Sequence, residues 1–148
     1  MLTRELNRLR VPFRMKCMSR PADYVRSDAS VLYVGSRYVQ CVARVVRDLP
    51  DFLGDQLHSP VPLFTKMLQA GIGVAEEPKS GASFGQHRCR LLAEGMIAAF
   101  DAGSQDPQRR FDAVKQRFEL EGIPLDRPYL SPGHVDTYEL PELGGIIV

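Results

Sequence analysis

Apolar residues in the first 48 positions follow the spacings of short helices and strands. Residues 2–9 carry leucines at helical spacing, which predicts a short helix that ends before the following proline. In residues 13–18 apolar and basic side chains alternate, which predicts a strand whose two faces differ in polarity. Residues 31–34 (V-L-Y-V) suit a buried strand, and residues 36–48 carry the apolar stripe of a helix.

The second half of the chain predicts two longer helices with clear starting signals. Residues 83–102 begin with S-F-G-Q, the pattern of a capping box, and residues 106–121 begin with D-P, an N-cap followed by a proline at the first helical position. A glycine follows the second helix and ends it. The expected core positions are Cys89, Leu92, Ala93, Met96, Ile97 and Phe100 in the first helix and Phe111, Val114, Phe118 and Leu120 in the second.

The order of elements along the chain predicts the fold class. Residues 50–62 contain three prolines and predict a loop, whereas residues 71–75 predict a further strand. Strands and helices are mixed without regular alternation, which favours an α+β fold: a small, mostly antiparallel sheet with two to four helices packed on it. A chain of 148 residues can bury one hydrophobic core, so residues 1–148 are expected to form a single domain.

Composition narrows the class of protein. Hydrophobic residues make up 44% of the chain and charged residues 25%, which is typical of soluble globular proteins. The sequence has no apolar run of about 18 residues, so we expect no membrane partner. The polar first ten residues lack the apolar stretch of a secretory signal. Three cysteines without C-x-x-C spacing point to a cytoplasmic protein, and three scattered histidines give no metal-ligand spacing. We therefore expect no metal and no cofactor.

The net charge of +1 conceals an uneven distribution of charge. Residues 1–47 contain ten basic and three acidic residues, a balance of +7, and the remainder carries −6. One interpretation is a surface whose two halves pair with each other. The other is a basic face that attracts an anionic substrate or partner. Nucleic acid is not the expected partner, because no aromatic-rich or low-complexity basic segment accompanies the arginines.

Cations gather at the beginning of the helix predicted from Ser83. His87, Arg88 and Arg90 fall in its first two turns, where backbone N–H groups and the helix dipole favour anions. This predicts a receptor for phosphate or carboxylate. At about 100° per residue, however, the two arginines fall on opposite flanks of the expected core stripe, and His87 points away from it. In the alternative, the arginines cover the edges of the core and pair with carboxylates such as Glu94.

Two lysines and a tyrosine complete the set of candidate side chains. Lys16 lies on the first predicted strand and Lys66 follows a proline-rich turn. A lysine acts as a base only where burial or neighbouring cations depress its pKa. Tyr33, in the second strand, faces either the core or a cleft. Arg26 and Asp28 precede that strand and predict a local ion pair or an Asx-turn.

Six segments, taken together, carry a family resemblance: F-R-M-K, R-S-D-A-S-V-L-Y-V, P-L-F-T-K-M-L, G-I-G-V-A-E-E-P, S-F-G-Q-H-R-C-R-L-L-A-E and R-P-Y-L. Through them the chain resembles, from Phe13 to Tyr129, the HopA-type bacterial type III effector family. The segment S-F-G-Q-H-R-C-R is the most specific. Relatives of this family occur in gene clusters for thioamide- and lanthionine-type modification of ribosomally made peptides. Members are often longer than this chain, which leaves open whether an N-terminal segment is missing.

The resemblance implies a phosphoserine/phosphothreonine lyase. A partner kinase would phosphorylate a precursor peptide, and metal-free β-elimination would then leave dehydroalanine or dehydrobutyrine. Such a reaction needs cations for the phosphate, a base for the Cα proton and an acid for the leaving group. The expected roles are Lys16 or Lys66 as the base, His87 or Tyr33 as the proton donor, and Arg26, Arg88 and Arg90 as phosphate-binding cations.

A second function stays open at this point. Effector members interact with host proteins, so the chain is alternatively a non-catalytic effector or a peptide-binding module, secreted into a host cell in the first case. The C-terminal residues 135–148 are acidic with an apolar end, and we expect them to form an edge strand or a docking segment.

Overall fold

The computed structural model describes residues 1–58 and 60–139. The chain divides into two compact units. Of the described residues, unit 1 comprises 1–58, 60–61, 67–73 and 137–139. Unit 2 comprises residues 62–66 and 74–136. Each unit has its own hydrophobic core.

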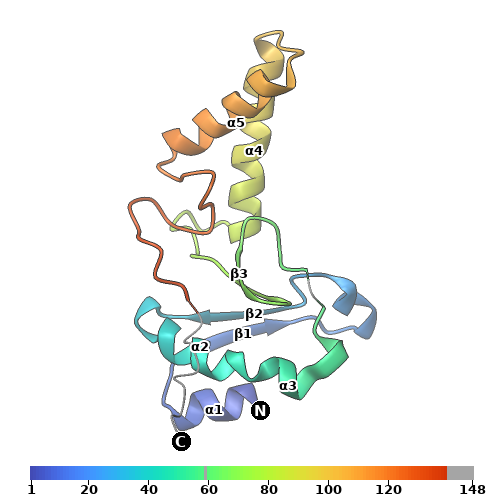
Figure 1. The fold of residues 1–148 in the computed structure, drawn as a ribbon, viewed down its shortest axis with the longest axis vertical. Coiled ribbons are helices and arrows are strands. Elements are labelled where there is room, and N and C mark those ends of the chain that lie inside the picture. Colours follow the sequence, from blue (N-terminus) through green and yellow to red (C-terminus); the bar gives the residue numbers. More distant parts are fainter. Residues whose placement is uncertain (59, 140–148) are drawn as a thin grey trace, which may run out of the picture. The chain divides into compact units, whose positions relative to one another are not determined.

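Unit 1 is built around an antiparallel sheet of two strands. β1 (Phe13–Cys17) pairs with β2 (Ser30–Val34), so that Arg14 lies opposite Tyr33 and Lys16 opposite Val31. Two helices, α1 (Leu2–Arg8) and α2 (Val39–Arg47), accompany the sheet, as Figure 1 shows. These four elements confirm the strands and helices that the hydrophobic pattern predicts in this part of the chain.

The core of unit 1 lies where its helices meet the sheet. Leu6 of α1 is fully buried and contacts Val42 and Val46 of α2, which lie in the segment predicted to carry an apolar stripe. Phe13 of β1 and Leu32 of β2 pack against this cluster. Burial of such aliphatic side chains contributes about 1.5–3 kcal/mol each, which is the main stabilisation available to elements as short as these.

The loop expected for residues 50–62 contains a short helix instead. α3 (Leu49–Leu53) has a proline in its first turn, where the missing N–H costs no intrahelical hydrogen bond. Further single-turn 3₁₀ helices occupy Pro21–Val25, Ser36–Tyr38 and Gly54–Gln56. In this segment the prediction took the three prolines as loop signals and did not consider Pro50 as a first-turn residue, and this is why it missed α3.

β3 (Lys66–Gln69) and β4 (Ile72–Val74) form a second two-stranded sheet through a tight hairpin. β4 confirms the predicted strand, whereas the sequence analysis did not foresee β3. Gly71 lies in the turn with φ of 73°, and a Cβ added there would lie 2.6 Å from Cγ of Leu57. A side chain at this position would therefore be both strained and crowded. With two small antiparallel sheets and several helices, the structure confirms the α+β prediction.

Unit 2 is organised by a helical hairpin. α4 (Phe84–Asp101) and α5 (Pro107–Leu120) lie side by side in Figure 1. Leu91 from α4 and Val114 and Phe118 from α5 form the core between them, with Ile123 from the following turn. Both predicted starting signals are present: Ser83 and Asp106 accept hydrogen bonds from backbone N–H groups in the first turns.

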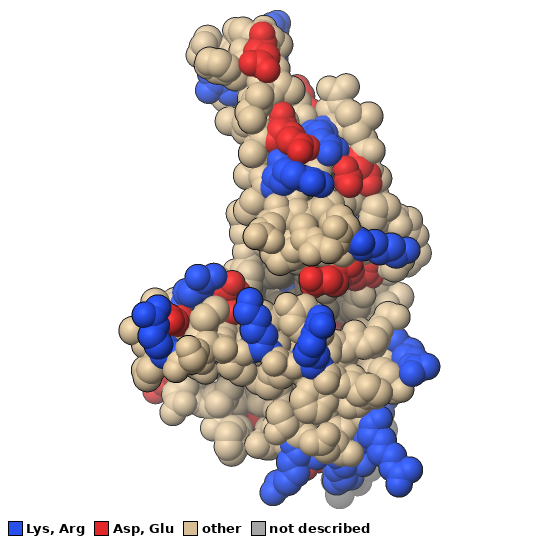
Figure 2. Space-filling model, turned by 180° about the vertical axis from the view of Figure 1, so that it is seen from behind, with Lys and Arg blue, Asp and Glu red and all other residues tan. Residues whose placement is uncertain are grey.

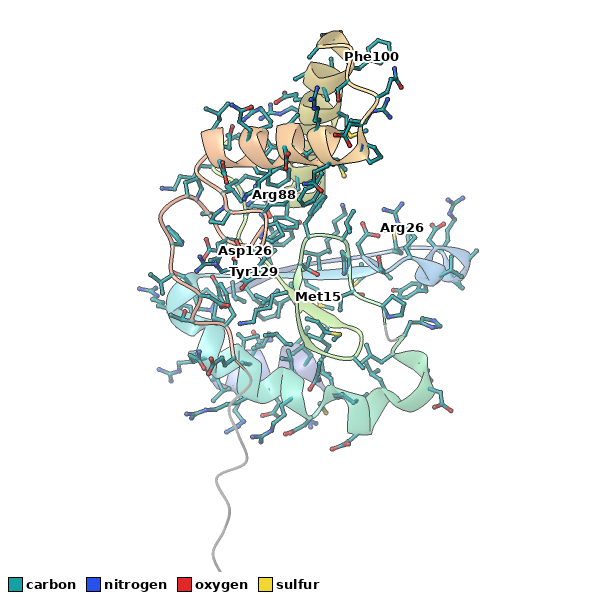
Figure 3. The ribbon with its side chains drawn as sticks, turned by 45° about the horizontal axis from the view of Figure 1, so that its top comes forward. Met15, Arg26, Arg88, Phe100, Asp126 and Tyr129 are labelled. Carbon is teal, nitrogen blue, oxygen red and sulfur yellow. The ribbon has the colours of Figure 1, made fainter. Side chains whose placement is uncertain are left out.

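Of the core stripe predicted for α4, only Leu92 packs against the core, and the other five positions are wrong. Its buried face runs through Arg88, Leu91, Gly95 and Ala99, whereas the expected Cys89, Ala93, Met96, Ile97 and Phe100 are exposed. Ile97 is 59% and Phe100 72% exposed, and Figure 3 shows Phe100 near the end of the helix. The reason is that α5 approaches closely at Gly95, where a Cβ would lie 2.5 Å from the Cα of Val114, so small residues face the partner helix. Of the positions predicted in α5, Val114 and Phe118 are buried, and Phe111 and Leu120 are exposed.

Charged side chains in unit 1 pair locally. Arg8 with Glu5, Arg20 with Asp23 and Arg47 with Asp48 are ion pairs between residues at most three positions apart. On the face drawn in Figure 2, basic side chains gather over unit 1, while both signs are mixed over the helical hairpin. The excess of basic charge in residues 1–47 is therefore a surface feature of unit 1.

The C-terminal expectation falls largely outside the described residues. Residues 135–139 form neither helix nor strand, although Tyr138 is buried and Gln40 of α2 donates a hydrogen bond to the carbonyl of Thr137. Residues 140–148 lie outside the part of the chain that the structure describes. Among the described residues, no helix combines the length and apolarity needed to cross a membrane.

Candidate functional site

The first turns of α4 hold the polar centre of unit 2. Ser83 accepts a hydrogen bond from the backbone N–H of Gln86, and the side chain of Gln86 in turn accepts one from the N–H of Ser83. This capping box starts the helix at a defined residue. As a consequence, His87 and Arg88 stand at fixed positions one turn further along.

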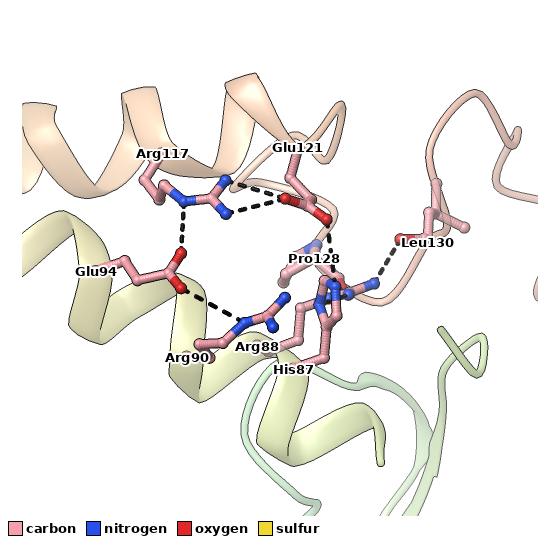
Figure 4. A network of polar contacts seen from close by, with 8 residues as sticks. All are labelled: His87, Arg88, Arg90, Glu94, Arg117, Glu121, Pro128 and Leu130. Carbon is pink, nitrogen blue, oxygen red and sulfur yellow. Dashed lines mark hydrogen bonds and ion pairs between the residues drawn. The ribbon is translucent and has the colours of Figure 1, made fainter. Parts of the chain in front are cut away.

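Arg88 is the most deeply buried charged side chain among the described residues, at 1% exposure. Its Nε donates to the carbonyl of Pro128 (2.6 Å) and its Nη2 to that of Leu130 (2.8 Å), as Figure 4 shows. The guanidinium also lies 4.9 Å from the ring centre of Phe84. Burial lowers the pKa of Arg88, but a guanidinium stays charged in proteins. Arg88 thus ties the 128–130 segment to α4.

His87 lies between Arg88 and Glu121, with 5% exposure. Its Nδ1 is 2.7 Å from Nη1 of Arg88, and its Nε2 is 3.4 Å from a carboxylate oxygen of Glu121. Since a guanidinium only donates hydrogen bonds, Nδ1 must be the unprotonated nitrogen, and Nε2 carries the proton that faces Glu121. Burial, together with the charge of Arg88, holds the pKa of His87 below its ordinary value. The prediction that His87 points away from the core is wrong.

A chain of ion pairs continues from Glu121 along the hairpin (Figure 4). Arg117 donates two hydrogen bonds to Glu121, both of 3.0 Å, and one to Glu94 of 2.7 Å. Burial raises the pKa of Glu121, but the hydrogen bonds and charge of Arg117, with His87, bring it below its ordinary value. Arg90 lies 3.6 Å from Glu94. The alternative prediction, that an arginine of α4 pairs with Glu94, is therefore confirmed for Arg90.

A cavity of about 320 Å³ opens beside this cluster, entirely within unit 2. Its wall combines the start of α4 with the loops before and after the hairpin. The residues that line it are Pro78, Lys79, Ser80, His87, Arg88, Glu121, Ile123, Ser131, Pro132 and His134. A concave site with convergent polar and titratable groups is the usual form of a ligand site.

A larger hollow of about 780 Å³ lies alongside the C-terminal half of α5. Its wall includes Phe111 and Leu125, and its charged residues are Lys115 with Glu119, an exposed ion pair at 3.8 Å, and Asp126. No histidine or arginine lines it. The smaller cavity is the better candidate for chemistry, because two histidines, the commonest groups for proton transfer, line it together with a lysine and an arginine.

A third polar cluster surrounds Lys66. Its ammonium lies 2.7 Å from Asp136 and 5.7 Å from the ring centre of Tyr129. The hydroxyl of Tyr129 donates to the same oxygen of Asp136 at 2.5 Å. Burial, with this hydrogen bond, raises the pKa of Tyr129 to about 12, so the hydroxyl keeps its proton at neutral pH. Lys66 thus shares unit 2 with the cavity.

The remaining predicted site residues belong to unit 1. Lys16 lies on β1 and is exposed, and Tyr33 lies on β2, half-buried, with the guanidinium of Arg14 4.8 Å from its ring centre. Arg26 donates two hydrogen bonds to Asp28, of 2.8 and 2.9 Å, which confirms the predicted local pair. Unit 2 therefore brings Lys66, His87, Arg88 and Arg90 into one compact body, and Lys16, Tyr33 and Arg26 lie in the other. Their catalytic and phosphate-binding roles stay predictions.

Sequence reasoning missed several residues of the cavity. Glu121 entered the prediction only as the end of a helix, His134 only as one of three scattered histidines, and Lys79 was not considered as a site residue. Glu76, which contacts His134, is 58 positions away from it in the chain. No spacing rule links such positions. The phrases G-I-G-V-A-E-E-P and R-P-Y-L, which lie near them in the sequence, were the available signal.

The lowered pKa of His87 in the folded chain predicts how the free energy of unfolding depends on pH. The unfolded chain, with an ordinary histidine pKa of 6.5, binds a proton before the folded chain does. The free energy of unfolding should therefore fall as the pH is lowered from about 7 to about 5. The carboxylates with lowered pKa values lose their contribution at lower pH than this. Urea unfolding at several pH values measures the effect.

His87→Asn is the matched variant for this test. Asparagine cannot titrate in this range, and its side-chain oxygen can accept a hydrogen bond near the position of Nδ1. The pH dependence between about 7 and about 5 should become weaker than in the wild type. An unchanged slope would assign the dependence to another group.

Comparison with known proteins gives one family for the chain. The sequence model of the HopA1 effector protein family matches residues 1–130, which include both helices of the hairpin and the capping box of α4. Comparison with curated proteins found no match.

Proposed function

The chain belongs to the HopA1 effector protein family, and from this premise we propose that it is a phosphoserine/phosphothreonine lyase. Its substrate would be a ribosomally made precursor peptide that a partner kinase has phosphorylated. The product would carry dehydroalanine or dehydrobutyrine. This proposal joins the family membership with the resemblance to peptide-modifying relatives.

The reaction sets three chemical requirements. A base removes the Cα proton, and the electrons of the C–H bond form the Cα–Cβ double bond. The Cβ–O bond breaks, and its electron pair leaves with the phosphate oxygen. Cations must hold the phosphate dianion, and a proton donor must assist the departing oxygen. Each role can be filled by side chains, without a redox step.

The observation that carries the proposal is the cavity beside α4. Its wall brings together Lys79, Arg88 and two histidines, His87 and His134, in about 320 Å³. Lysine and arginine are the usual partners of phosphate, and histidine is the commonest group for proton transfer. Glu121, the acidic group of the wall, is hydrogen-bonded to Arg117, which offsets its charge.

Lys66 is the candidate base within unit 2. Its ammonium contacts Asp136 and lies near the face of Tyr129, so both its position and its orientation are defined. A lysine accepts a proton only as the free amine, whereas a carboxylate partner such as Asp136 favours the protonated ammonium. For Lys66 to act as the base, its ion pair with Asp136 would therefore have to break. Lys16, on β1 of unit 1, remains the second candidate.

A specific observation favours the non-catalytic alternative. The three arginines predicted to bind phosphate already have partners: Arg26 contacts Asp28, Arg88 contacts two carbonyls, and Arg90 contacts Glu94. A guanidinium that is fully engaged in this way stabilises the fold and has fewer donors for a ligand. In the alternative, the chain is an effector or peptide-binding module, and its polar clusters serve stability.

Mass spectrometry separates the two functions. The full chain is incubated with synthetic peptides that carry phosphoserine or phosphothreonine. In a second arm it is incubated with the unphosphorylated peptides after treatment with a candidate kinase encoded next to it. A lyase removes phosphoric acid and leaves a dehydro residue that adds a thiol. A phosphatase, by contrast, leaves the hydroxyl and no thiol-reactive product.

The variants Lys66→Ala and Lys16→Ala assign the base. Removal of a general base lowers the rate about 100-fold or more, so one of the two variants should lose elimination while the other retains it. Peptide binding without any elimination in the wild type, across all peptides and with the kinase present, would reject the lyase and support the binding module.

A further inference from the structure

We propose that His134, held in place by Glu76, is the proton donor of the cavity in unit 2. The inference rests on the proposed lyase function and replaces His87 and Tyr33 in that role. It gives the leaving phosphate a cationic partner that also supplies the proton. Glu76 acts as a positioning residue.

The carboxylate of Glu76 is fixed by the backbone around it. One of its oxygens accepts a hydrogen bond from the N–H of Ser131 at 2.6 Å, and its own N–H donates to the carbonyl of Tyr129 at 2.8 Å. The side chain of Glu76 is 13% exposed. His134 belongs to the same turn, since its N–H donates to the carbonyl of Ser131. Both partners are therefore anchored to the 129–134 segment.

The contact between Glu76 and His134 decides which ring nitrogen meets a ligand. Nδ1 of His134 lies 2.8 Å from the oxygen Oε2 of Glu76. A carboxylate only accepts protons, so Nδ1 carries its proton towards Glu76. Nε2 is then the nitrogen left for the cavity, which the ring lines. When Nε2 is also protonated, the ring is a cation that can bind a phosphate oxygen and transfer a proton to it.

His87 lacks this freedom, although it lines the same cavity. Its Nδ1 accepts from Arg88 and its Nε2 faces Glu121, and the ring is 5% exposed. The side chain of His134 is 51% exposed, so a ligand can reach it without displacing a buried contact. Geometry therefore makes His87 a structural group and His134 the reactive one.

In the elimination step, the proton on Nε2 of His134 moves to the phosphate oxygen as the Cβ–O bond breaks. The base holds the Cα proton, and the double bond takes the electrons of the former C–H bond. Afterwards the base releases the Cα proton to solvent and the ring takes up one proton from solvent, which restores both groups. The charged and titratable groups that surround this event are Glu76, Lys79, His87, Arg88 and Glu121.

The first test measures elimination from a phosphothreonine peptide with four variants of the full chain. His134→Gln should lower kcat about 100-fold or more, and should abolish the fall of the rate at alkaline pH that a protonated donor imposes. His58→Gln, in unit 1, is the matched control and should keep the wild-type rate. Glu76→Gln should lower kcat with little change in KM, and Glu76→Asp, which restores the carboxylate, should recover part of the loss.

The second test does not depend on turnover. Inorganic phosphate is titrated into the wild-type chain while NMR follows the ring signals of its three histidines. The signals of His134 should shift and saturate, and those of His58 should not. The nitrogen shifts of the free chain should show the proton on Nδ1 of His134. A ring protonated on Nε2 alone, or signals of His134 that phosphate leaves unchanged, would overturn the assignment.

The two tests distinguish failure of this inference from failure of the proposed function. If the wild type eliminates phosphate and His134→Gln does so equally fast, the lyase stands and the donor is another group. If no peptide is converted but phosphate still shifts the NMR signals of the His134 ring, the lyase reaction is rejected, and the cavity is an anion-binding site. If neither is observed, both proposals fail.

Discussion

Replacing Arg88 by alanine is expected to lower the free energy of unfolding by about 3–5 kcal/mol. The substitution removes a fully buried guanidinium and leaves the carbonyls of Pro128 and Leu130 without their donor. Buried acceptors without a partner cost about 1–3 kcal/mol each. The ring of Phe84 also loses the cation that it faces. Urea unfolding of the full chain, followed by circular dichroism, measures the change.

Arg90→Ala is the matched control for this experiment. Arg90 lies two positions further along the same helix, is about half exposed, and contacts Glu94 at 3.6 Å. Exposed ion pairs within a helix contribute about 0.3–0.5 kcal/mol, so the two variants should differ about tenfold in effect. Arg88→Lys should fall near Arg88→Ala, because an ammonium cannot reproduce the guanidinium fork. Equal effects at positions 88 and 90 would contradict the structural role given to Arg88.

Opposite effects are expected from alanine at two glycines of α4. Gly95 faces α5, where a Cβ would lie 2.5 Å from the Cα of Val114. Alanine there forces the helices apart, and such overpacking costs about 1–3 kcal/mol. At Gly85 an added Cβ would meet nothing within 4 Å. Alanine at Gly85 should therefore stabilise the chain by about 0.4–1 kcal/mol, through its better helix propensity and the smaller entropy of the unfolded state.

The sign of the difference is the decisive result for the glycine pair. Helix propensity alone predicts that both substitutions stabilise the protein. Close packing at Gly95 predicts that only Gly85→Ala does. Stabilisation by Gly95→Ala would show that α4 and α5 are further apart than the structure has them. Thermal and urea unfolding of both variants provide the measurement.

The starting points of the helices could be predicted because they depend on neighbours in the chain. The helix-starting signals are the capping box of Ser83 with Gln86 and the N-cap Asp106 followed by Pro107. Each involves residues at most three positions apart, and both helices begin where the sequence predicts. The alternation in β1 and the apolar run of β2 identified two strands in the same way. The ion pair of Arg26 and Asp28 joins residues two positions apart, so it could also be predicted from the sequence.

The buried face of α4 could not be predicted from hydrophobicity. Leu91 is buried, but three other large apolar residues of the helix, Met96, Ile97 and Phe100, lie on the exposed side. The partner helix instead packs against Gly95 and Ala99, because small residues let two backbones approach. A rule that counts apolar side chains assigns the stripe to the larger residues, and His87 then falls on the wrong side.

The amino-acid sequence by itself determined the helix and strand segments that depend on local signals, the α+β class and the family to which the chain belongs. Only the tertiary structure decided which of the two cavity histidines is buried and which one a ligand can reach. It also decided that Arg88 binds backbone carbonyls and that Glu76 meets His134. The physical reason is the separation along the chain of the residues that interact. Helix capping and strand alternation depend on residues that are close together in the sequence. Burial and the pairing of distant charges depend on contacts that exist only after the chain has folded.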